Sequence, residues 1–303
     1  MEKLTKLVIF GDPQKKGVPE AISQFADFVK DKAEIIGNYN VMHLHKLCLD
    51  EKNAGSPYYT EIQEVLKKSD YAVVFGGDGS IICAARFVCE ANVPIIGVNV
   101  GKLGFLAEFN VAELKTRFPE IINNKIKIEK RMMLDCLISG SEGTKGNFSS
   151  SAINDIYITS GPPFRMIELR IFVDGQPLAG CISDGLIIST PTGSTAYNLS
   201  AGGPIVSSQM DAIVITPICP HSLTFRPIVI SADSIIEVFG LRVNEGTTIS
   251  IDGQVSLKLS SEQTIKISKK DSFFMIVKNP LLSQWDTLAA KLSWGEKPKY
   301  NKT

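Results

Sequence analysis

The chain has 303 residues, of which 44% are hydrophobic, and its 32 basic and 32 acidic side chains balance. This length allows two domains with separate cores, and the balanced charge argues against a nucleic acid or an acidic membrane surface as the main partner. No apolar stretch approaches the roughly 20 residues that span a bilayer. The six scattered cysteines lack C-x-x-C spacing, which argues against zinc and disulfides and favours free thiols in a reducing cytoplasm.

The first third of the chain alternates between strand and helix patterns. Apolar periodicity predicts strands over residues 7–10, 71–75 and 94–99, and helices over 19–30, 59–68 and 81–91. Such alternation predicts a parallel sheet, and ligands bind at the loops that follow the carboxyl ends of its strands. Two glycine-rich loops, 76–80 and 101–105, follow strands of this region and are expected at one edge of the sheet.

The loop Gly76-Gly77-Asp78-Gly79-Ser80 is the most informative segment of the chain. A strand, a turn almost without side chains and a helix N-terminus together let a phosphate approach backbone N–H groups. The single acid, Asp78, is placed either to hold a metal or to take a proton from an attacking hydroxyl. Neither a Walker-type loop nor a dinucleotide fingerprint after the first strand is present. A P-loop kinase is therefore excluded at the motif level, and a dehydrogenase is disfavoured.

After about residue 124 the pattern of apolar and polar residues becomes typical of antiparallel strands joined by turns. Alternating runs lie at 132–138, 156–158 and 168–172, and a last strand is predicted over 273–277, with a helix over 283–292. We therefore expect an α/β domain with a parallel sheet over 1–124 and a β-rich, sandwich-like domain over 125–280. The helix and tail over 281–303 are expected to return to the first domain.

A second polar segment follows a predicted strand over 186–189. A short helix is expected from about residue 195, and four hydroxyl-bearing residues lie within six positions at its start: Thr190, Thr192, Ser194 and Thr195. Capping of the helix requires only one or two hydroxyls, so the excess favours a sugar- or phosphate-bearing ligand. Asn154-Asp155 could hold ribose hydroxyls or form a plain strand edge. Asp252-Gly253-Gln254 is typical of a hairpin turn. His221 is expected to have a structural role. The alternation of His43 and His45 predicts a strand, and these two histidines could bind a metal only if further ligands lay close to them.

Taken in order, these segments closely resemble the ATP–NAD kinase family over about two thirds of the chain. The first motif alone is also found in diacylglycerol, sphingosine and phosphofructokinase-type enzymes, whereas the Thr-Pro-Thr-Gly-Ser-Thr-Ala-Tyr block is highly specific. The resemblance rests on residues 76–79, 99–106, 154–155, 183–185, 190–197, 200–204, 220–223, 226–227 and 252–254.

The resemblance implies an enzyme that transfers the γ-phosphate of ATP to the 2′-hydroxyl of the adenosine ribose of NAD, giving NADP, with Mg²⁺ or Mn²⁺. It also implies a cytoplasmic homodimer or homotetramer. The resemblance further implies that Asp78 is the catalytic base or a carboxylate that binds the metal. It also implies that Gly76, Gly77 and Gly79 line the ATP phosphates. The implied NAD-binding residues are Gly79, Phe105, Asn154, Asp155, Asp184, Thr192, Thr195, Ala196, Tyr197, Ser200, Asp252 and Gln254.

Two positions depart from the family pattern. Asp155 stands where relatives usually carry Glu, and Ile182 stands where some bacterial relatives carry Arg, which leaves the preference for NAD or NADH open. Polyphosphate remains an alternative donor to ATP. Two other readings stay open: a lipid kinase that shares the glycine loop, and a catalytically silent dinucleotide-binding regulator.

Overall fold

The computed structural model describes residues 4–49, 56–101, 104–140, 147–261 and 263–294. The chain divides into two compact units. The first unit contains Met1–Leu47, Lys52–Glu129 and Met275–Thr303, and the second contains Cys48–Glu51 and Lys130–Phe274. The functional domain boundaries at residues 124 and 280 stay a prediction.

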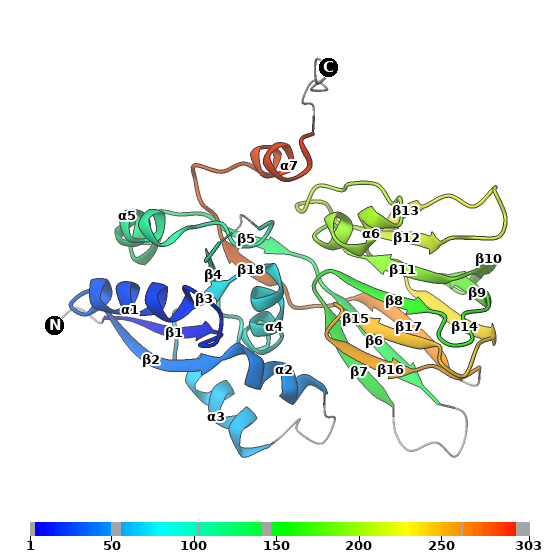
Figure 1. Cartoon of the computed structure of the whole chain (residues 1–303), viewed down its shortest axis with the longest axis horizontal. Coiled ribbons are helices and arrows are strands. Elements are labelled where there is room, and N and C mark those ends of the chain that lie inside the picture. Colours follow the sequence, from blue (N-terminus) through cyan, green and yellow to red (C-terminus); the bar gives the residue numbers. More distant parts are fainter. Residues whose placement is uncertain (1–3, 50–55, 102–103, 141–146, 262, 295–303) are drawn as a thin grey trace, which may run out of the picture. The chain divides into compact units, whose positions relative to one another are not determined.

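The first unit is built on one six-stranded sheet with the order β2-β1-β3-β4-β18-β5 (Figure 1). β1 pairs in parallel with β2 and β3, and β4 pairs in parallel with β3 and β18. The loops after β1, β3 and β4 therefore leave the same edge of the sheet. The strands are β1 (Thr5–Gly11), β2 (Ala33–Asn40), β3 (Tyr71–Gly76), β4 (Ile95–Asn99), β5 (Ile128–Arg131) and β18 (Phe274–Val277).

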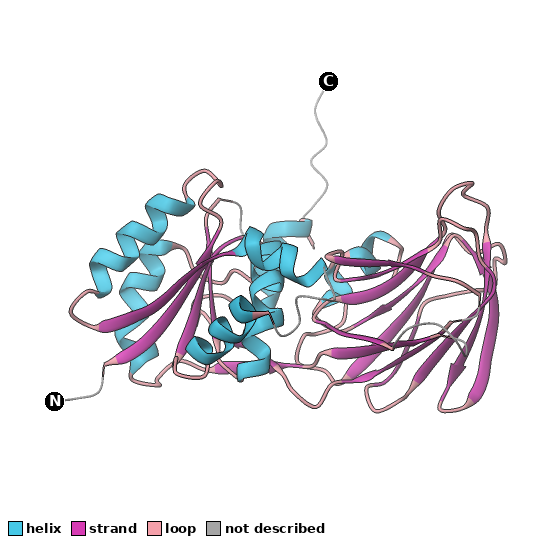
Figure 2. Cartoon of the chain, turned by 90° about the horizontal axis from the view of Figure 1, so that it is seen from below, coloured by secondary structure: helices cyan, strands magenta, loops and turns pink. Residues whose placement is uncertain are grey.

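Helices cover both faces of this sheet (Figure 2). α1 and α5 pack on one face, where Phe25 and Phe118 join alternate residues of β1 and β3 in one apolar core. α4 contacts β3, and α3 contacts α4. Burial on both faces explains the continuous apolar run of β3. The helices are α1 (Val18–Val29), α2 (Val41–Leu49), α3 (Pro57–Leu66), α4 (Asp78–Val88), α5 (Val111–Ile122) and α7 (Gln284–Leu292), with a short 3₁₀ turn η2 (Cys89–Ala91).

The second unit contains two six-stranded antiparallel sheets. One has the order β10-β9-β14-β17-β6-β7 and the other β13-β12-β11-β8-β15-β16. The strands of the first sheet are β6 (Leu134–Ser139), β7 (Phe148–Ala152), β9 (Ile167–Val173), β10 (Gln176–Ser183), β14 (Ile236–Arg242) and β17 (Thr264–Lys269). Those of the second are β8 (Asp155–Thr159), β11 (Gly185–Ser189), β12 (Ala212–Ile218), β13 (Ile228–Ser231), β15 (Thr248–Ile251) and β16 (Val255–Lys258).

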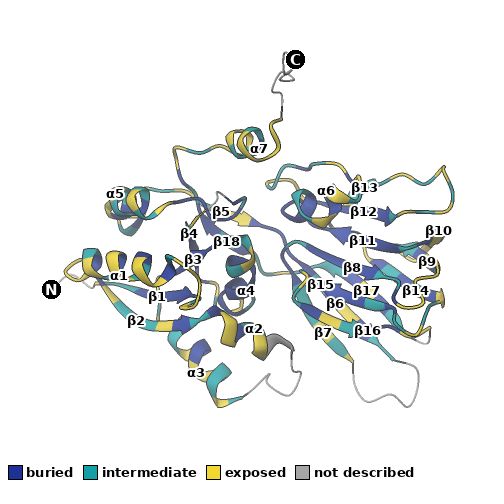
Figure 3. Ribbon diagram, in the orientation of Figure 1, coloured by how far each residue is buried: buried dark blue, intermediate teal, exposed yellow. Residues whose placement is uncertain are grey.

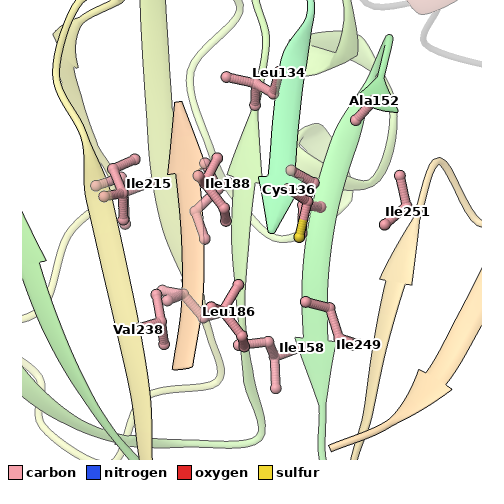
Figure 4. Close-up of a cluster of buried hydrophobic side chains, with 14 of the residues drawn as sticks. Leu134, Cys136, Ala152, Ile158, Leu186, Ile188, Ile215, Val238, Ile249 and Ile251 are labelled. Atoms are coloured by element: carbon pink, nitrogen blue, oxygen red, sulfur yellow. The ribbon is translucent and has the colours of Figure 1, made fainter. Parts of the chain in front are cut away.

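Both sheets of the second unit contribute side chains to one buried core, which defines a β-sandwich (Figure 4). Leu134, Cys136 and Val238 come from one sheet, and Leu186 and Ile215 from the other. Along β9, buried Ile167, Leu169 and Ile171 alternate with more exposed residues, as expected for strands with one face in the core (Figure 3). The predicted fold class is confirmed.

One local prediction was wrong, and two others are refined by the structure. His43 and His45 lie in α2, not in a strand, and no group of three metal-ligating side chains occurs among the described residues. The predicted last strand near 273–277 is confirmed as β18, which pairs with β4 of the first sheet. The short helix expected from about Thr195 forms as the four-residue α6 (Tyr197–Ser200), which follows a 3₁₀ turn, η3 (Gly193–Thr195).

Two expectations about membranes and thiols can be compared with the structure. In the described part of the chain, none of the helices is both long and apolar enough to cross a bilayer. Five cysteines of the described residues form no disulfide; four of them are buried, and Cys219 is exposed. Cys48 lies where no side chain is described.

Candidate active site

The Asp78 carboxylate is held in one orientation by the loop that follows β4. Asp78 Oδ2 accepts the backbone N–H of Phe105 at 2.9 Å, and Oδ1 accepts that of Leu106 at 2.9 Å. Asp78 is the first residue of α4, and the N–H groups of a first helical turn attract negative charge. A carboxylate has about four acceptor positions, so about two remain for a substrate proton or a metal.

Glycines at this edge of the sheet are required by close contacts. A Cβ on Gly104 would lie 2.0 Å from Asp78 Oδ1, and a Cβ on Gly76 would lie 2.4 Å from Ser80 Oγ. Gly76 also has φ +154, a backbone conformation that L side chains rarely adopt. The glycines therefore let two loops close around Asp78. At Gly79, an added Cβ would meet no heavy atom of the described residues within 4 Å, apart from Gly79 itself and its neighbours in the chain.

Phe105 lies beside Asp78 in the sequence-predicted site. Its backbone N–H binds Asp78, and the ammonium group of Lys291 from α7 lies 5.2 Å from its ring centroid, which is within the range of a cation–π contact. Lys102 and Leu103 of the resembling segment lie outside the described residues. In the first unit the structure thus brings together Gly76, Gly77, Asp78, Gly79 and Phe105.

In the second unit, the segment 153–155 and the segment 190–193 are bound to each other. Thr190 N–H donates to Asn154 O at 2.8 Å, and the Thr190 hydroxyl donates to Ile153 O at 2.6 Å. β8 and β11 are adjacent strands, with Asp155 opposite Ser189. Two motifs that are 35 residues apart in the chain therefore form one continuous edge.

Asp252 organises this edge through the backbone. Its carboxylate accepts N–H groups from Ile153, Asn154 and Asp155 at 2.7–3.2 Å. Asp252 N–H in turn donates to Asp155 O at 2.8 Å. The turn 252–254 was read from sequence as a plain hairpin and, through the resemblance, as part of the NAD site. These contacts add a positioning role for Asp252 that its sequence context did not indicate.

Asp155 is a buried carboxylate with an unusual environment. It is 3% exposed, and its Oδ2 atom has no hydrogen-bond partner among the described residues. Burial, and to a lesser degree the nearby charge of Asp252, together raise the pKa of Asp155 to about 7, although a hydrogen bond from the Tyr197 backbone acts in the opposite direction. An unpaired buried oxygen is costly, so this side chain is a candidate ligand-binding group.

Three of the four hydroxyls in the segment 190–195 form hydrogen bonds within the chain. Thr195 Oγ1 donates to Thr192 O at 3.4 Å, whereas the hydroxyls of Thr190 and Ser194 are fully buried and serve the fold. Besides its bond to Ile153, Thr190 Oγ1 accepts the N–H of Gly193 at 3.0 Å. Ser194 Oγ donates to Pro191 O and accepts the N–H of Val206. The excess of hydroxyls is therefore not explained by a ligand at these two positions. Thr192 and Thr195 stay predicted NAD contacts.

A buried asparagine, Asn198, fixes the end of this segment and was missed by the sequence reasoning. Its amide donates to Ser194 O and Pro204 O, each at 3.1 Å, and its carbonyl accepts the Thr216 hydroxyl at 2.6 Å. The only sequence signal was an amide within an otherwise apolar and hydroxyl-rich helix start. Asn198 holds Tyr197 and its neighbours in place rather than facing a ligand.

The other predicted NAD contacts of the second unit lie at two separate places. Tyr197 is 37% exposed and packs edge-on against Tyr157, with ring centroids 5.0 Å apart. Ala196 and Ser200 lie in the same short helical segment, and Gln254 lies in the Asp252 turn. Asp184 precedes β11, whereas Thr190 follows it, so the two are separated by the length of that strand, about 17–20 Å.

The second unit also has an open cavity of about 480 Å³ that includes Ile182. Its other lining residues are Arg165, Met166, His221, Arg242 and Asn244. His221 N–H donates to Ile182 O at 2.9 Å, which is a structural role for the backbone of His221. None of the predicted NAD contacts lines this cavity.

Gly193 provides a test of how tightly the two motifs of the second unit are packed. A Cβ on Gly193 would lie 2.0 Å from Asn154 O, a backbone atom that cannot rotate away. We expect Gly193→Ala to lower the unfolding free energy by about 1–3 kcal/mol, because overpacking displaces the backbone. Thermal unfolding measures this loss. Gly180→Ala, where an added Cβ meets nothing within 4 Å, is the control; equal midpoints for both variants would contradict the prediction.

Together, the fold and these contacts define a class of protein. An α/β unit with a glycine-framed carboxylate at a helix N-terminus is suited to phosphate chemistry. The β-sandwich with its polar edge is suited to a sugar-bearing ligand. The chain matches the ATP-NAD kinase N-terminal domain over residues 17–126 and the ATP-NAD kinase C-terminal domain over residues 153–279. It belongs to the ATP-NAD kinase family.

Individual relatives support the same assignment. The chain is 39% identical to the NAD kinase of Geotalea daltonii over 81% of this chain and 86% of the relative, and 32% identical to that of Alcanivorax borkumensis over 99% and 97%. Among solved structures, yeast NADH kinase complexed with NADH superimposes with a TM-score of 0.83 at 27% identity, covering 99% of this chain and 90% of that chain. An NAD kinase from Archaeoglobus fulgidus in complex with ATP shares the fold, with a TM-score of 0.71 at 23% identity, covering 95% of this chain and 99% of that chain.

Proposed function

We propose that this NAD kinase moves the γ-phosphate of ATP to the 2′-hydroxyl of the adenosine ribose of NAD, with Asp78 as the base. The observation that carries this proposal is the fixed Asp78 carboxylate at the start of α4, with both oxygens oriented by backbone N–H groups. A ribose hydroxyl is a weak nucleophile until a base within hydrogen-bond reach accepts its proton. Phosphoryl transfer otherwise depends on positioning and on donors that stabilise charge.

The acceptor roles follow the polar edge of the second unit. Asn154 and Asp155 would hold ribose hydroxyls, because the buried Oδ2 of Asp155 has no hydrogen-bond partner in the described structure. Tyr197 offers an exposed aromatic ring, and Thr192, Thr195, Ala196, Ser200 and Gln254 would complete the contacts. Asp252 would act mainly by holding residues 153–155, as its three backbone hydrogen bonds support.

A divalent metal, Mg²⁺ or Mn²⁺, fits the residues present only as a partner of the donor's phosphates. Asp78 has acceptor positions left after binding two N–H groups, and no cluster of three metal-ligating side chains exists in the described residues. Mg²⁺ is commonly held by one or two carboxylates together with substrate phosphates, so Asp78 alone would suffice on the protein side. When bound, the metal would offset the negative charge of the transferring phosphate.

We propose a homodimer or homotetramer in the cytoplasm. Asp184 lies at the opposite end of β11 from the proposed ribose-binding edge. The Asp184 of a second copy of the chain could therefore complete the site of its neighbour. Free cysteines are typical of a reducing compartment. Light scattering of the purified protein would give the number of subunits, and a monomer that retains full activity would remove the shared site.

One assay tests the proposed reaction against the two rivals. The protein is incubated with ATP, Mg²⁺ and NAD, and NADP is measured with an NADP-specific dehydrogenase. NADP formation is expected, and a lipid substrate in place of NAD should give no product. NAD binding without NADP formation would instead favour a silent dinucleotide-binding regulator. Replacing ATP by polyphosphate, and NAD by NADH, would identify the donor and the preferred acceptor.

A further inference from the structure

We infer that Lys15, in the loop between β1 and α1, binds the phosphate chain of the phosphoryl donor; this inference rests on the proposed function. The Lys15 ammonium nitrogen lies 3.9 Å from the position that a Cβ would take on Gly77. Apart from Gly77 itself and its neighbours in the chain, no other heavy atom of the described residues comes within 4 Å of that position. Among the described residues outside the loop, the Lys15 ammonium group is therefore the nearest group to this side of Gly77.

The position of Lys15 is set by a short, hydrogen-bonded turn. Asp12 Oδ1 accepts the N–H of Gln14 at 2.9 Å, and Asp12 O accepts the N–H of Lys15 at 3.1 Å. Lys15 O accepts the N–H of Val18 at 3.1 Å, which joins the turn to the start of α1. The backbone of Lys15 is thus fixed although its side chain is solvent-exposed.

A close approach between this loop and the segment after β4 keeps Lys15 over the same edge of the sheet. Gly17 has φ +84, and a Cβ on it would lie 3.2 Å from a methyl group of Val100. β1, β3 and β4 are parallel neighbours, so the loops that bear Lys15, Gly77 and Val100 leave the sheet side by side. This edge is where ligands bind in open parallel sheets.

The charge of Lys15 has no other use in the described structure. Its side chain forms no hydrogen bond or ion pair with any described residue. The loop Gly76-Gly77-Asp78-Gly79-Ser80 contains no cationic side chain, so it offers a phosphate only N–H groups and one hydroxyl. A flexible ammonium group is a common partner of nucleotide phosphates. Lys15 supplies the positive charge that the glycine loop lacks.

The test compares Lys15→Met, which removes the charge but keeps an unbranched side chain, with Lys16→Met as the matched control. Lys16 is the adjacent exposed lysine of the same loop. We expect Lys15→Met to raise the KM for ATP about tenfold or more, because the loss of a hydrogen bond to a charged group weakens binding by about that factor. KM for NAD should stay within about twofold, and Lys15→Arg should restore most of the ATP affinity.

A binding measurement makes the test independent of turnover. Calorimetry with tripolyphosphate and with ATP, in the absence of NAD, should show about tenfold weaker binding to Lys15→Met than to the wild type or Lys16→Met. An unchanged affinity for both probes, or an equal loss in both variants, would overturn the role of Lys15. A wild-type protein that binds tripolyphosphate through Lys15 but forms no NADP would refute the proposed function and leave this inference standing.

Discussion

Replacing Asp78 by Asn is expected to lower the rate of NADP formation by about 100-fold or more, while NAD binding is retained. An amide cannot accept the proton of the 2′-hydroxyl, so the nucleophile is no longer activated. Steady-state kinetics with varied ATP, NAD and metal measure the loss, and NAD binding is followed by calorimetry. Asp27→Asn, an exposed aspartate on α1, is the matched control and should leave the rate unchanged.

The local contacts of Asp78 determine how this variant must be examined. Asp78 accepts one N–H on each oxygen, so the Asn amide group would face either the Phe105 or the Leu106 N–H. An unpaired donor at that place costs about 1–3 kcal/mol, which could shift the loop 104–106. The thermal midpoint and the NAD affinity are therefore measured beside the rate. A slow variant with normal NAD affinity identifies a chemical role.

The metal dependence of the same variant separates a base from a metal ligand. If Asp78 is the base, kcat falls while the Mg²⁺ concentration for half-maximal rate stays the same. If Asp78 mainly holds the metal, that concentration rises and high Mg²⁺ restores part of the rate. Turnover within about threefold of the wild type would remove Asp78 from both roles.

The sequence was most informative where structure is local. The strand, glycine turn and helix around Asp78 lie within about 20 consecutive residues, and their pattern alone predicted β3 and α4, although α4 begins at Asp78, three residues before the predicted start. The alternating patterns after residue 124 likewise predicted antiparallel strands, because a period of two residues marks a sheet with one buried face. Each of these signals needs no knowledge of distant parts of the chain.

What the sequence did not predict depends on residues that are far apart along the chain. Asp252 binds the N–H groups of residues 153–155 across nearly 100 positions, and nothing in Asp252-Gly253-Gln254 distinguishes this role from a simple turn. β18 reaches β4 of the first sheet in the same way. His43 and His45 alternate like strand residues, yet buried Val41 and Leu44 are three positions apart, a helical spacing that the alternation concealed.

Lys15 illustrates the same limit for the site itself. Lys15 is one of two adjacent lysines in a surface loop, and such lysines are usually exposed to solvent without a specific role. Only the parallel pairing of β1 with β3 brings that loop beside Gly77. The rule that ligands gather at the carboxyl ends of parallel strands was available from the sequence, but it does not say which side chain of a loop points to its neighbour.

Replacing Asp155 by Asn is expected to stabilise the protein at high pH, although Asp155 is a predicted NAD contact. Burial and the nearby Asp252 charge raise the pKa of Asp155 from 3.8 to about 7. Between these values the folded protein binds a proton that the unfolded chain has lost, so the unfolding free energy falls as the pH rises. Each pKa unit corresponds to about 1.4 kcal/mol, which sets an upper limit of about 4 kcal/mol on this destabilisation above pH 7.

The measurement is the thermal midpoint of wild type and Asp155→Asn from pH 5 to pH 8. The wild-type midpoint should drop relative to that of the variant as the pH approaches 7, and the difference should level off above it. About 2–4 °C per kcal/mol is expected for a unit of this size. Asp233→Asn changes an exposed aspartate of the same unit and should follow the wild type. Parallel curves for Asp155→Asn and wild type would show that Asp155 does not titrate in this range.

The same substitution should raise the KM for NAD roughly tenfold, because the carboxylate oxygen that has no partner among the described residues is the group proposed to accept a ribose hydroxyl. Stability and binding would then change in opposite directions at one residue. That combination distinguishes a functional carboxylate from a structural one: a structural Asp155 would lose stability when its charge is removed. On this hypothesis the cost of burying Asp155 is retained for function, because the acceptor position would be filled when NAD binds.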